Sequence, residues 1–229
     1  MKFAIARPPV PSLSIAGRSE RFPVNRIFCV GRNYAAHARE MGGDERDPPF
    51  FFQKSASALV DASAPVSIAY PPKTADFHHE VELVVALGHG GFEISQDQAG
   101  RLIYGYAVGL DMTRRDVQKA LRDKGRPWEL GKSFHQSAPI GAIAPAMTVE
   151  NLESGTIFLD INGASRQRAA LDNMIWSVAE TIAFLSQYEP LQPGDLIMTG
   201  TPEGVGPVIA GDILHGHVDG LPPIQVSIV

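Results

Sequence analysis

The 229-residue sequence has one cysteine, no long apolar run and no cluster of basic residues. Cys29 cannot form an internal disulfide, which is typical of a protein from a reducing cytoplasm. No run reaches the ~18 apolar residues of a membrane span, and the first residues lack the apolar core of a signal peptide. Lys and Arg number 20 against 25 Asp and Glu, a net charge of −5, which argues against nucleic-acid binding. We therefore expect a cytoplasmic protein that binds neither nucleic acid nor membranes.

Several catalytic motifs are also missing. The sequence has no Gly-x-Ser-x-Gly elbow for a serine nucleophile and no HExxH pair for zinc. A glycine-rich stretch at residues 199–206 lacks the Lys-Ser/Thr of a phosphate-binding loop. Its backbone amides and threonine hydroxyls could still bind a carboxylate. These absences exclude the commonest nucleophilic, zinc and nucleotide sites.

The composition predicts a β-dominated α+β fold. Glycine (22) and proline (18) are spread along the whole chain, as expected for short strands joined by turns. Residues 1–24 are proline-rich and predict an irregular N-terminal extension, followed by one domain at residues 25–229. Helical spacing and capping residues predict few helices. The expected strands are 26–30, 78–87, 104–111, 156–162, 195–199 and 223–229, and the expected helices are 33–41, 116–124 and 173–187.

Two carboxylates, Glu80 and Glu82, interrupt an apolar run that predicts a buried strand. Side chains two residues apart share one face of a strand, so both acids would be desolvated and would repel each other. Asp111 ends a second apolar run and could supply a third carboxylate. Three carboxylate oxygens suit Mg²⁺ or Mn²⁺. The alternative is an edge strand whose acidic face lies in water.

Further candidates lie on the predicted helix 33–41 and near residue 130. His37 and Glu40 are three residues apart and share a helix face, so the carboxylate could orient the imidazole to activate water. An exposed charge pair is the alternative. Lys132 lies among apolar residues and could stabilise an oxyanion, unless it is a surface lysine. Lys54 admits the same two interpretations with less support.

Together, these motifs resemble the fumarylacetoacetate hydrolase family, in particular its short members that cleave acylpyruvates. The resemblance begins near Arg26 and continues to the C-terminus. It depends on the order and spacing of residues 30–34 with His37, 79–83, 105–118, 131–134 and 194–202. Residues 48–52 and 216–221 are most similar to the fumarylpyruvate hydrolases of gentisate breakdown, which favours fumarylpyruvate as substrate.

The resemblance implies a mixed, rolled-up β-sheet with few short helices, and a homodimer. It implies that Glu80, Glu82 and Asp111 bind one Mg²⁺ or Mn²⁺, that His37 and Glu40 form a water-activating dyad on a lid, and that Lys132 faces the substrate. It also implies substrate contacts from four further residues: Arg32, Arg115, Gln118 and Thr201. Residues 43–47 would belong to the lid loop, where relatives vary.

The predicted residues suit hydrolysis of a β-diketo acid. Water activated by His37 would attack the distal carbonyl, and the cation would stabilise the departing pyruvate enolate. Two alternatives stay open. The same site could decarboxylate oxaloacetate, which also yields a pyruvate enolate and needs no water nucleophile. The carboxylates could instead form a structural cation site in a binding protein. A distal carboxylate on the substrate would need a cationic partner, for which Arg32, Arg115, Arg126 and Arg168 are candidates.

Overall fold

The computed structural model describes residues 3–35 and 47–229. The fold is β-dominated with few short helices, as the sequence predicts. The strands are β1 (Ser12–Ser14), β2 (Arg21–Pro23), β3 (Ile27–Gly31), β4 (Phe50–Lys54), β5 (Leu59–Asp61), β6 (Val66–Ile68), β7 (Phe77–His79), β8 (Val81–Leu87), β9 (Ile103–Leu110), β10 (Thr113–Arg114), β11 (Ala138–Ile140), β12 (Ala144–Pro145), β13 (Thr156–Ile161), β14 (Ala164–Ala170), β15 (Leu196–Met198), β16 (Gly206–Pro207), β17 (Ile213–Val218) and β18 (Ile224–Ile228). The α-helices are α2 (Gln96–Ala99), α3 (Arg115–Arg122), α4 (Glu129–Lys132) and α5 (Val178–Leu185), and the 3₁₀ helices are η1 (Ala56–Ala58), η2 (Gly100–Leu102), η3 (Ala146–Thr148), η4 (Leu152–Ser154) and η5 (Leu171–Asn173). None of these helices is long and apolar enough to cross a membrane.

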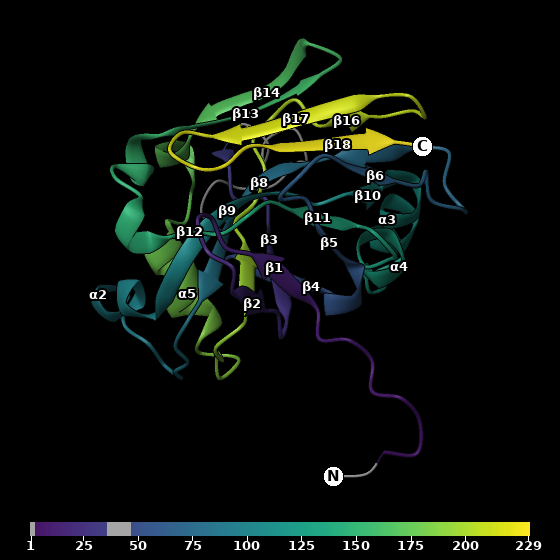
Figure 1. Cartoon of the computed structure of the whole chain (residues 1–229). Helices are drawn as coiled ribbons and strands as arrows, with labels where there is room; N and C mark the ends of the chain where they lie inside the picture. Colours follow the sequence, from purple (N-terminus) through teal and green to yellow (C-terminus); the bar gives the residue numbers. More distant parts are fainter. Residues whose placement is uncertain (1–2, 36–46) are drawn as a thin grey trace.

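Two sheets form most of the molecule (Figure 1). The larger has the strand order β4-β3-β15-β8-β9-β11-β5, with β12 paired to β9. It is mixed, since β15 pairs with β3 in parallel and with β8 antiparallel. The second sheet has the order β14-β13-β17-β18-β6 and lies across the first. A short third sheet, β10-β7-β16, connects the two layers close to residue 80.

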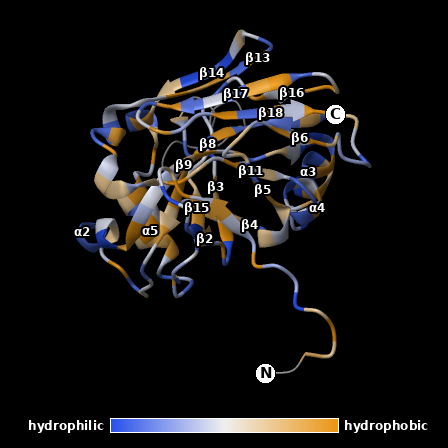
Figure 2. Ribbon diagram, viewed as in Figure 1, coloured by the Kyte–Doolittle hydropathy of each residue, from blue (hydrophilic) through white to orange (hydrophobic). Residues whose placement is uncertain are grey.

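Apolar side chains from the two large sheets pack against each other in one buried cluster. Figure 2 colours stretches of both sheets as hydrophobic. Leu83 and Val108 on the larger sheet pack in one cluster with Leu159 and Val226 on the smaller sheet. Alternation places the neighbouring side chains of β8 on the opposite face, where Val84 and Ala86 join a second cluster. Strand β8 is therefore buried on both faces, which explains its nearly continuous apolar sequence.

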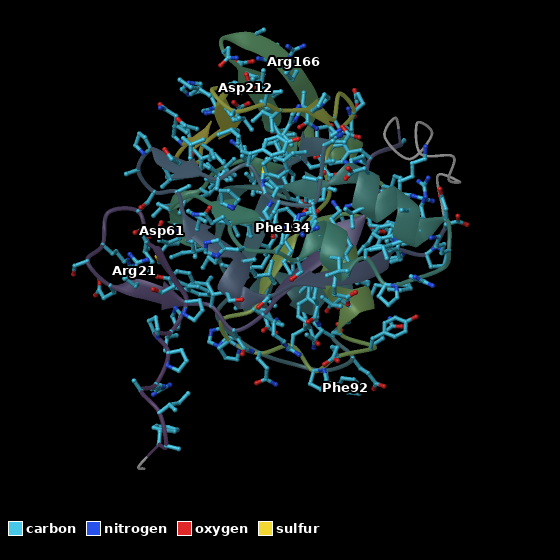
Figure 3. The ribbon with its side chains drawn as sticks, turned by 90° about the vertical axis from the view of Figure 1, so that its right-hand side faces the viewer. Arg21, Asp61, Phe92, Phe134, Arg166 and Asp212 are labelled. Carbon is cyan, nitrogen blue, oxygen red and sulfur yellow. The ribbon has the colours of Figure 1, made fainter. Side chains whose placement is uncertain are left out.

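The N-terminal residues differ from the sequence prediction. We expected residues 1–24 to be irregular, but β1 and β2 form an antiparallel hairpin. Leu13 and Phe22 of this hairpin are buried against the larger sheet. An ion pair of 2.7 Å between Arg21 and Asp61 attaches the hairpin to β5, and the two side chains point toward one another in Figure 3. The prolines hid the alternation, because strands of three residues give almost no periodic signal. The predicted division at residues 24 and 25 stays a prediction.

Two of the predicted helices can be compared with the structure. Helix α3 confirms the expected helix at 116–124, beginning one residue earlier and ending two residues earlier. The expected helix at 173–187 was too long, because α5 begins at Val178 after a capping box formed by Ser177 and Glu180. Most of the expected helix at 33–41 lies outside the described residues.

Candidate active site

Glu80, Glu82 and Asp111 come together at one end of the larger sheet. One carboxylate oxygen of each lies within 4.8 Å of the others, and all three residues are buried. Glu82 is 2% exposed on β8, an interior strand between β15 and β9. The alternative of an acidic face in water at a sheet edge is therefore wrong. Asp111 directly follows β9, as the sequence predicts.

The predicted strand 78–87 is interrupted at Glu80. β7 ends at His79 and pairs with β10 and β16, whereas β8 begins at Val81 and pairs with β9 and β15. Glu80 therefore lies where the chain passes from the small connecting sheet to the larger sheet. Its carbonyl accepts a hydrogen bond of 2.9 Å from the Asp111 amide, which fixes the two ligand-bearing segments to each other. The prediction that Glu80 and Glu82 share one face of a single strand was therefore incomplete, although both side chains do line one pocket.

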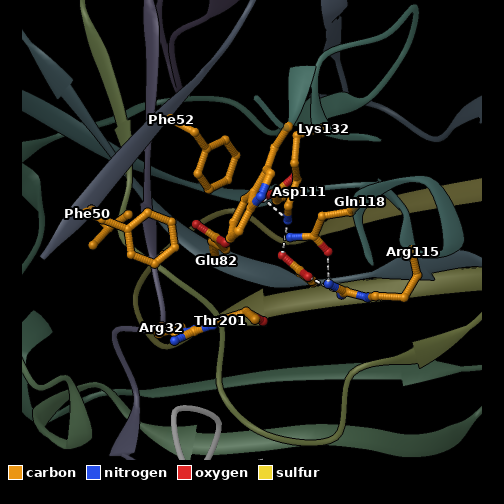
Figure 4. Close-up of a pocket in the computed structure, with 13 residues that line it drawn as sticks. Arg32, Phe50, Phe52, Glu82, Asp111, Arg115, Gln118, Lys132 and Thr201 are labelled. Atoms are coloured by element: carbon orange, nitrogen blue, oxygen red, sulfur yellow. Dashed lines mark hydrogen bonds and ion pairs between the residues drawn. The ribbon is translucent and has the colours of Figure 1, made fainter. Parts of the chain in front are cut away.

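Three cationic side chains surround the carboxylates, and Figure 4 draws two of them, Lys132 and Arg115. Lys132, at the end of α4, places its ammonium group 2.6 Å from Glu80 Oε2 and 2.7 Å from Asp111 Oδ2. Lys54 Nζ lies 2.7 Å from Asp111 Oδ1 and donates to the carbonyls of Met112 and Lys132. Arg115 pairs with Glu80 and donates to Gln118 Oε1. When all are ionised, three negative charges face three positive charges.

Glu82 has the least compensation of the three acids. Burial, followed by the charges of Asp111 and Glu80, raises the pKa of Glu82 well above its usual value. Its Oε2 accepts a hydrogen bond of 2.8 Å from the Gly200 amide. Gly200 has a φ of +97°, and a Cβ there would lie 2.7 Å from Asn33, so only glycine brings this amide so close. The carboxyl group is thus held in place while its charge is poorly stabilised.

A divalent cation fits this arrangement. Carboxylate oxygens from three segments converge within 4.8 Å, and oxygen donors are the ligands that Mg²⁺ and Mn²⁺ prefer. Positive charge near Glu82 would also favour its ionised form, which burial disfavours. The set offers no sulfur or imidazole ligand, in line with the exclusion of zinc from the sequence. These three residues could therefore hold Mg²⁺ or Mn²⁺.

The structure brings the predicted substrate-contact residues to the same pocket. Arg32, Arg115, Gln118 and Thr201 all line it, together with aromatic side chains. Gln118 and Thr201 are buried, at 4% and 3% exposed. Arg32 has a left-handed backbone, with a φ of 59°, and its guanidinium lies 5.9 Å from the centre of the Phe50 ring. A strained backbone at a non-glycine residue is commonest at functional sites.

His37 and Glu40 lie outside the described residues, so the dyad stays a prediction. Lys54, which the sequence supported only weakly, proves to be 1% exposed and in direct contact with Asp111. The sequence contained a signal for this burial, since Lys54 ends β4, which begins with three phenylalanines and packs against the core. Gln167 was missed altogether, because β14 is otherwise mainly polar and exposed. Cys29 is fully buried, and burial raises the pKa of its thiol, so it is not a nucleophile.

Comparison with known proteins extends the likeness over the whole chain. The family model described as fumarylacetoacetate (FAA) hydrolase C-terminal matches residues 26–229. A fumarylpyruvate hydrolase from Ralstonia sp is 51% identical over 179 residues, covering 78% of this chain and 92% of that protein. The oxaloacetate tautomerase YcgM of Escherichia coli is 38% identical over 200 residues, covering 87% and 90%. The crystal structure of fumarylpyruvate hydrolase from Pseudomonas aeruginosa in complex with Mn²⁺ and pyruvate matches with a TM-score of 0.95 and 51% identity, over 100% of this chain and 99% of that one.

Proposed function

Because this chain belongs to the fumarylacetoacetate hydrolase family, we propose that it hydrolyses a carbon–carbon bond of an acylpyruvate, with fumarylpyruvate as the preferred substrate. The products would be fumarate and pyruvate, as in gentisate breakdown. Two findings support the substrate class: the identity of 51% to a fumarylpyruvate hydrolase, and a neighbouring structure that contains Mn²⁺ and pyruvate. We further propose that residues 25–229 are the catalytic domain and that the protein is a homodimer, as the family resemblance implies. The single cysteine supports a cytoplasmic location.

The charge balance of the site carries this proposal. Three carboxylates and three cationic groups cancel, so a divalent cation would leave the cluster with two positive charges. Every acylpyruvate carries a carboxylate beside two keto oxygens, and fumarylpyruvate carries a second carboxylate, which makes it a dianion. The site therefore suits an anionic keto acid better than a neutral substrate. The cation would be Mg²⁺ or Mn²⁺, held by Glu80, Glu82 and Asp111.

Each buried group has a task in hydrolysis. When bound, Mg²⁺ or Mn²⁺ would supply Lewis-acid stabilisation of negative charge on the keto-acid oxygens. Lys132 would neutralise charge on the same oxygens during attack, because its ammonium group lies between Glu80 and Asp111. Lys54 forms an ion pair with Asp111, and Arg115 forms one with Glu80. These ion pairs fix the positions of the carboxylate oxygens before a cation binds. Gln118 in turn orients Arg115.

His37 would accept a proton from the attacking water, and Glu40 would orient the imidazole. The oxygen of that water bonds to the distal acyl carbon. The bond between this carbon and the methylene then breaks, and its electron pair leaves with the pyruvate enolate. Protonation of the enolate carbon completes pyruvate, while the acyl group leaves as a carboxylate. This assignment rests on the sequence and the family, since the dyad lies outside the described residues.

A second candidate activity acts on oxaloacetate. It is favoured by the identity of 38% to an oxaloacetate tautomerase. Oxaloacetate, like an acylpyruvate, is a 2-oxo acid, so the same cation and Lys132 could stabilise its enolate or assist its decarboxylation. Neither reaction needs a water nucleophile. Assaying acylpyruvates beside oxaloacetate, through the loss of enol absorbance and the release of pyruvate, tests which activity dominates.

We expect kcat/KM for fumarylpyruvate to exceed that for acetylpyruvate by at least ~tenfold, because a charged hydrogen bond to a second carboxylate contributes on the order of 1.5–3 kcal/mol. Both compounds share the pyruvyl half and differ only in the acyl end. Steady-state kinetics with Mn²⁺ at one pH would measure the ratio. Equal or reversed values would show a general acylpyruvase.

Arg32→Met is expected to remove most of this preference. Of the four arginines considered, Arg126 and Arg168 are exposed outside the pocket, and Arg115 is paired with Glu80. Arg32 lines the pocket, and no ion pair within residues 3–35 and 47–229 engages it. Arg32→Met should therefore lower kcat/KM for fumarylpyruvate by about tenfold and change that for acetylpyruvate little.

Arg168→Met is the matched control, since Arg168 lies exposed on β14 over the Phe158 ring. It should leave both rate constants unchanged. If Arg32→Met reduced the two substrates by the same factor, Arg32 would not be the partner of the distal carboxylate.

A further inference from the structure

Gln167 is a buried amide that joins the pocket to the smaller sheet. It belongs to β14, the edge strand of that sheet, where it is 1% exposed while its neighbours Arg166 and Arg168 are exposed. The register between β13 and β14 shifts beside it, between Leu159 and Asp160. Such a bulge redirects side chains. Here it accompanies a polar side chain that points inward from a solvent-exposed strand.

All the hydrogen-bonding capacity of the Gln167 amide is used. Its Nε2 donates to Thr201 Oγ1 at 2.8 Å and to the Pro202 carbonyl at 2.9 Å. Its Oε1 accepts from the Val81 amide at 3.1 Å and lies 2.9 Å from His79 Nδ1. The Val81 amide can only donate and the Pro202 carbonyl can only accept, so the orientation of the amide is fixed. Two donor and two acceptor positions are therefore filled by one side chain.

These bonds connect the two halves of the proposed site. His79 and Val81 flank Glu80, so Oε1 holds the chain on both sides of that carboxylate. Thr201 lines the substrate pocket and belongs to the loop whose Gly200 amide binds Glu82. A close approach at Gly204 keeps this loop against β14, because a Cβ there would lie 2.1 Å from the Arg166 carbonyl. Gln167 is the polar part of that contact.

The bond from Nε2 also fixes the polarity of the Thr201 hydroxyl. A hydroxyl oxygen that accepts from an amide N–H is left with its own proton to donate elsewhere. Thr201 is 3% exposed and lines the pocket, so that proton is available to an acceptor bound there. An anionic keto acid offers carboxylate and carbonyl oxygens, which only accept. A donor hydroxyl at this position complements them, whereas an acceptor would repel them.

We propose that Gln167 is a positioning residue that makes Thr201 a hydrogen-bond donor to the carboxylate of the bound keto acid. This proposal rests on the proposed function for the identity of the ligand. Gln167 does not line the pocket, and it acts through Thr201. Its effect is therefore on ligand binding more than on the rate of bond cleavage.

Gln167→Met, which keeps the length of the side chain and removes every donor and acceptor, tests the proposal. We expect KM for fumarylpyruvate to rise about threefold to tenfold with kcat within about twofold. The dissociation constant of pyruvate from the Mn²⁺-loaded protein, measured by calorimetry, should rise by a similar factor. In a Thr201→Val background the same substitution should raise both values by a smaller factor than in the wild type, because the hydroxyl that it orients is gone and only its bonds beside Glu80 are still lost.

Gln225→Met is the matched control, since Gln225 lies half-buried on β18 of the same sheet. It should leave KM and pyruvate binding unchanged. Gln167→Glu serves as a second variant if Gln167→Met does not fold. A glutamate oxygen in place of Nε2 would accept the Thr201 proton and leave lone pairs facing the ligand, so KM should rise at least as much.

The outcomes separate this proposal from the proposed function. A fall in melting temperature with KM and pyruvate binding unchanged would make Gln167 purely structural and overturn the proposal. Additive effects of Gln167→Met and Thr201→Val would overturn it as well. If the wild type bound pyruvate more tightly than Gln167→Met but hydrolysed no acylpyruvate, the proposed function would fail and the role of Gln167 would stand. A wild type that neither bound pyruvate nor turned over would overturn both.

Discussion

Alanine in place of Glu80, Glu82 or Asp111 is expected to lower kcat/KM for fumarylpyruvate by at least ~10³-fold, since Lewis-acid stabilisation supplies several kcal/mol. Each change removes one oxygen from a set that lies within 4.8 Å. Glu80→Ala and Asp111→Ala also remove an ion-pair partner of buried cationic groups, most directly of Lys54 in Asp111→Ala. Removal of divalent ions by EDTA and gel filtration should abolish turnover of the wild type, and Mn²⁺ or Mg²⁺ should restore it.

Two controls make this result specific. Asp97→Asn removes an exposed carboxylate on α2 and should leave turnover and Mn²⁺ affinity unchanged. Glu82→Gln keeps the shape of the side chain and removes a charge that burial disfavours, so the metal-free protein should melt no lower than the wild type. Electron paramagnetic resonance of added Mn²⁺ should nevertheless show much weaker binding. Full activity of the wild type in excess EDTA would disprove the mechanism.

His37→Ala is expected to reduce hydrolysis of fumarylpyruvate by ~10²-fold or more, the usual contribution of a general base. Mn²⁺ affinity should be nearly unchanged, because the dyad is not among the proposed ligands. The physical reason is the proposed division of tasks: the cation and Lys132 would stabilise the enolate, whereas His37 would be needed only to generate the nucleophile. Stopped assays with fumarylpyruvate and Mn²⁺ titration of the same preparation would measure both quantities.

Oxaloacetate provides the matched control for His37→Ala. Its decarboxylation yields an enolate without a water nucleophile, so any such activity should fall much less than hydrolysis does. If the proposed dyad exists, Glu40→Gln should reduce hydrolysis less than His37→Ala does, since an amide could accept a hydrogen bond from the imidazole but would stabilise its charged form poorly. If His37→Ala hydrolysed fumarylpyruvate at the parental rate, the pair would be an ordinary surface ion pair.

Local pattern was sufficient for much of this protein. Apolar runs predicted strands at 26–30, 78–87 and 104–111, and the structure has strands at Ile27–Gly31, Val81–Leu87 and Ile103–Leu110. The acids that interrupt or end two of these runs indicated Glu80, Glu82 and Asp111. These inferences succeed because a buried strand appears in the sequence as a local run of apolar residues. The order of the motifs then indicated the family, which the comparisons confirm. Short elements such as the β1–β2 hairpin gave no periodic signal and were missed.

Only the tertiary structure decided how the charges of the site are compensated. Lys54 and the carbonyl that it bonds at Met112 are 58 residues apart, and Gln167 is 88 residues from His79. The interruption of the strand at Glu80 likewise depends on pairing with β10 and β16, which lie far along the chain. Sequence by itself determined which residue types could bind a cation and an anionic keto acid. The partners that neutralise, orient and hold those residues come from distant segments, and only folding brings them within hydrogen-bond distance. A hydrogen bond or ion pair depends on separation in space, so it leaves no periodic pattern along the sequence.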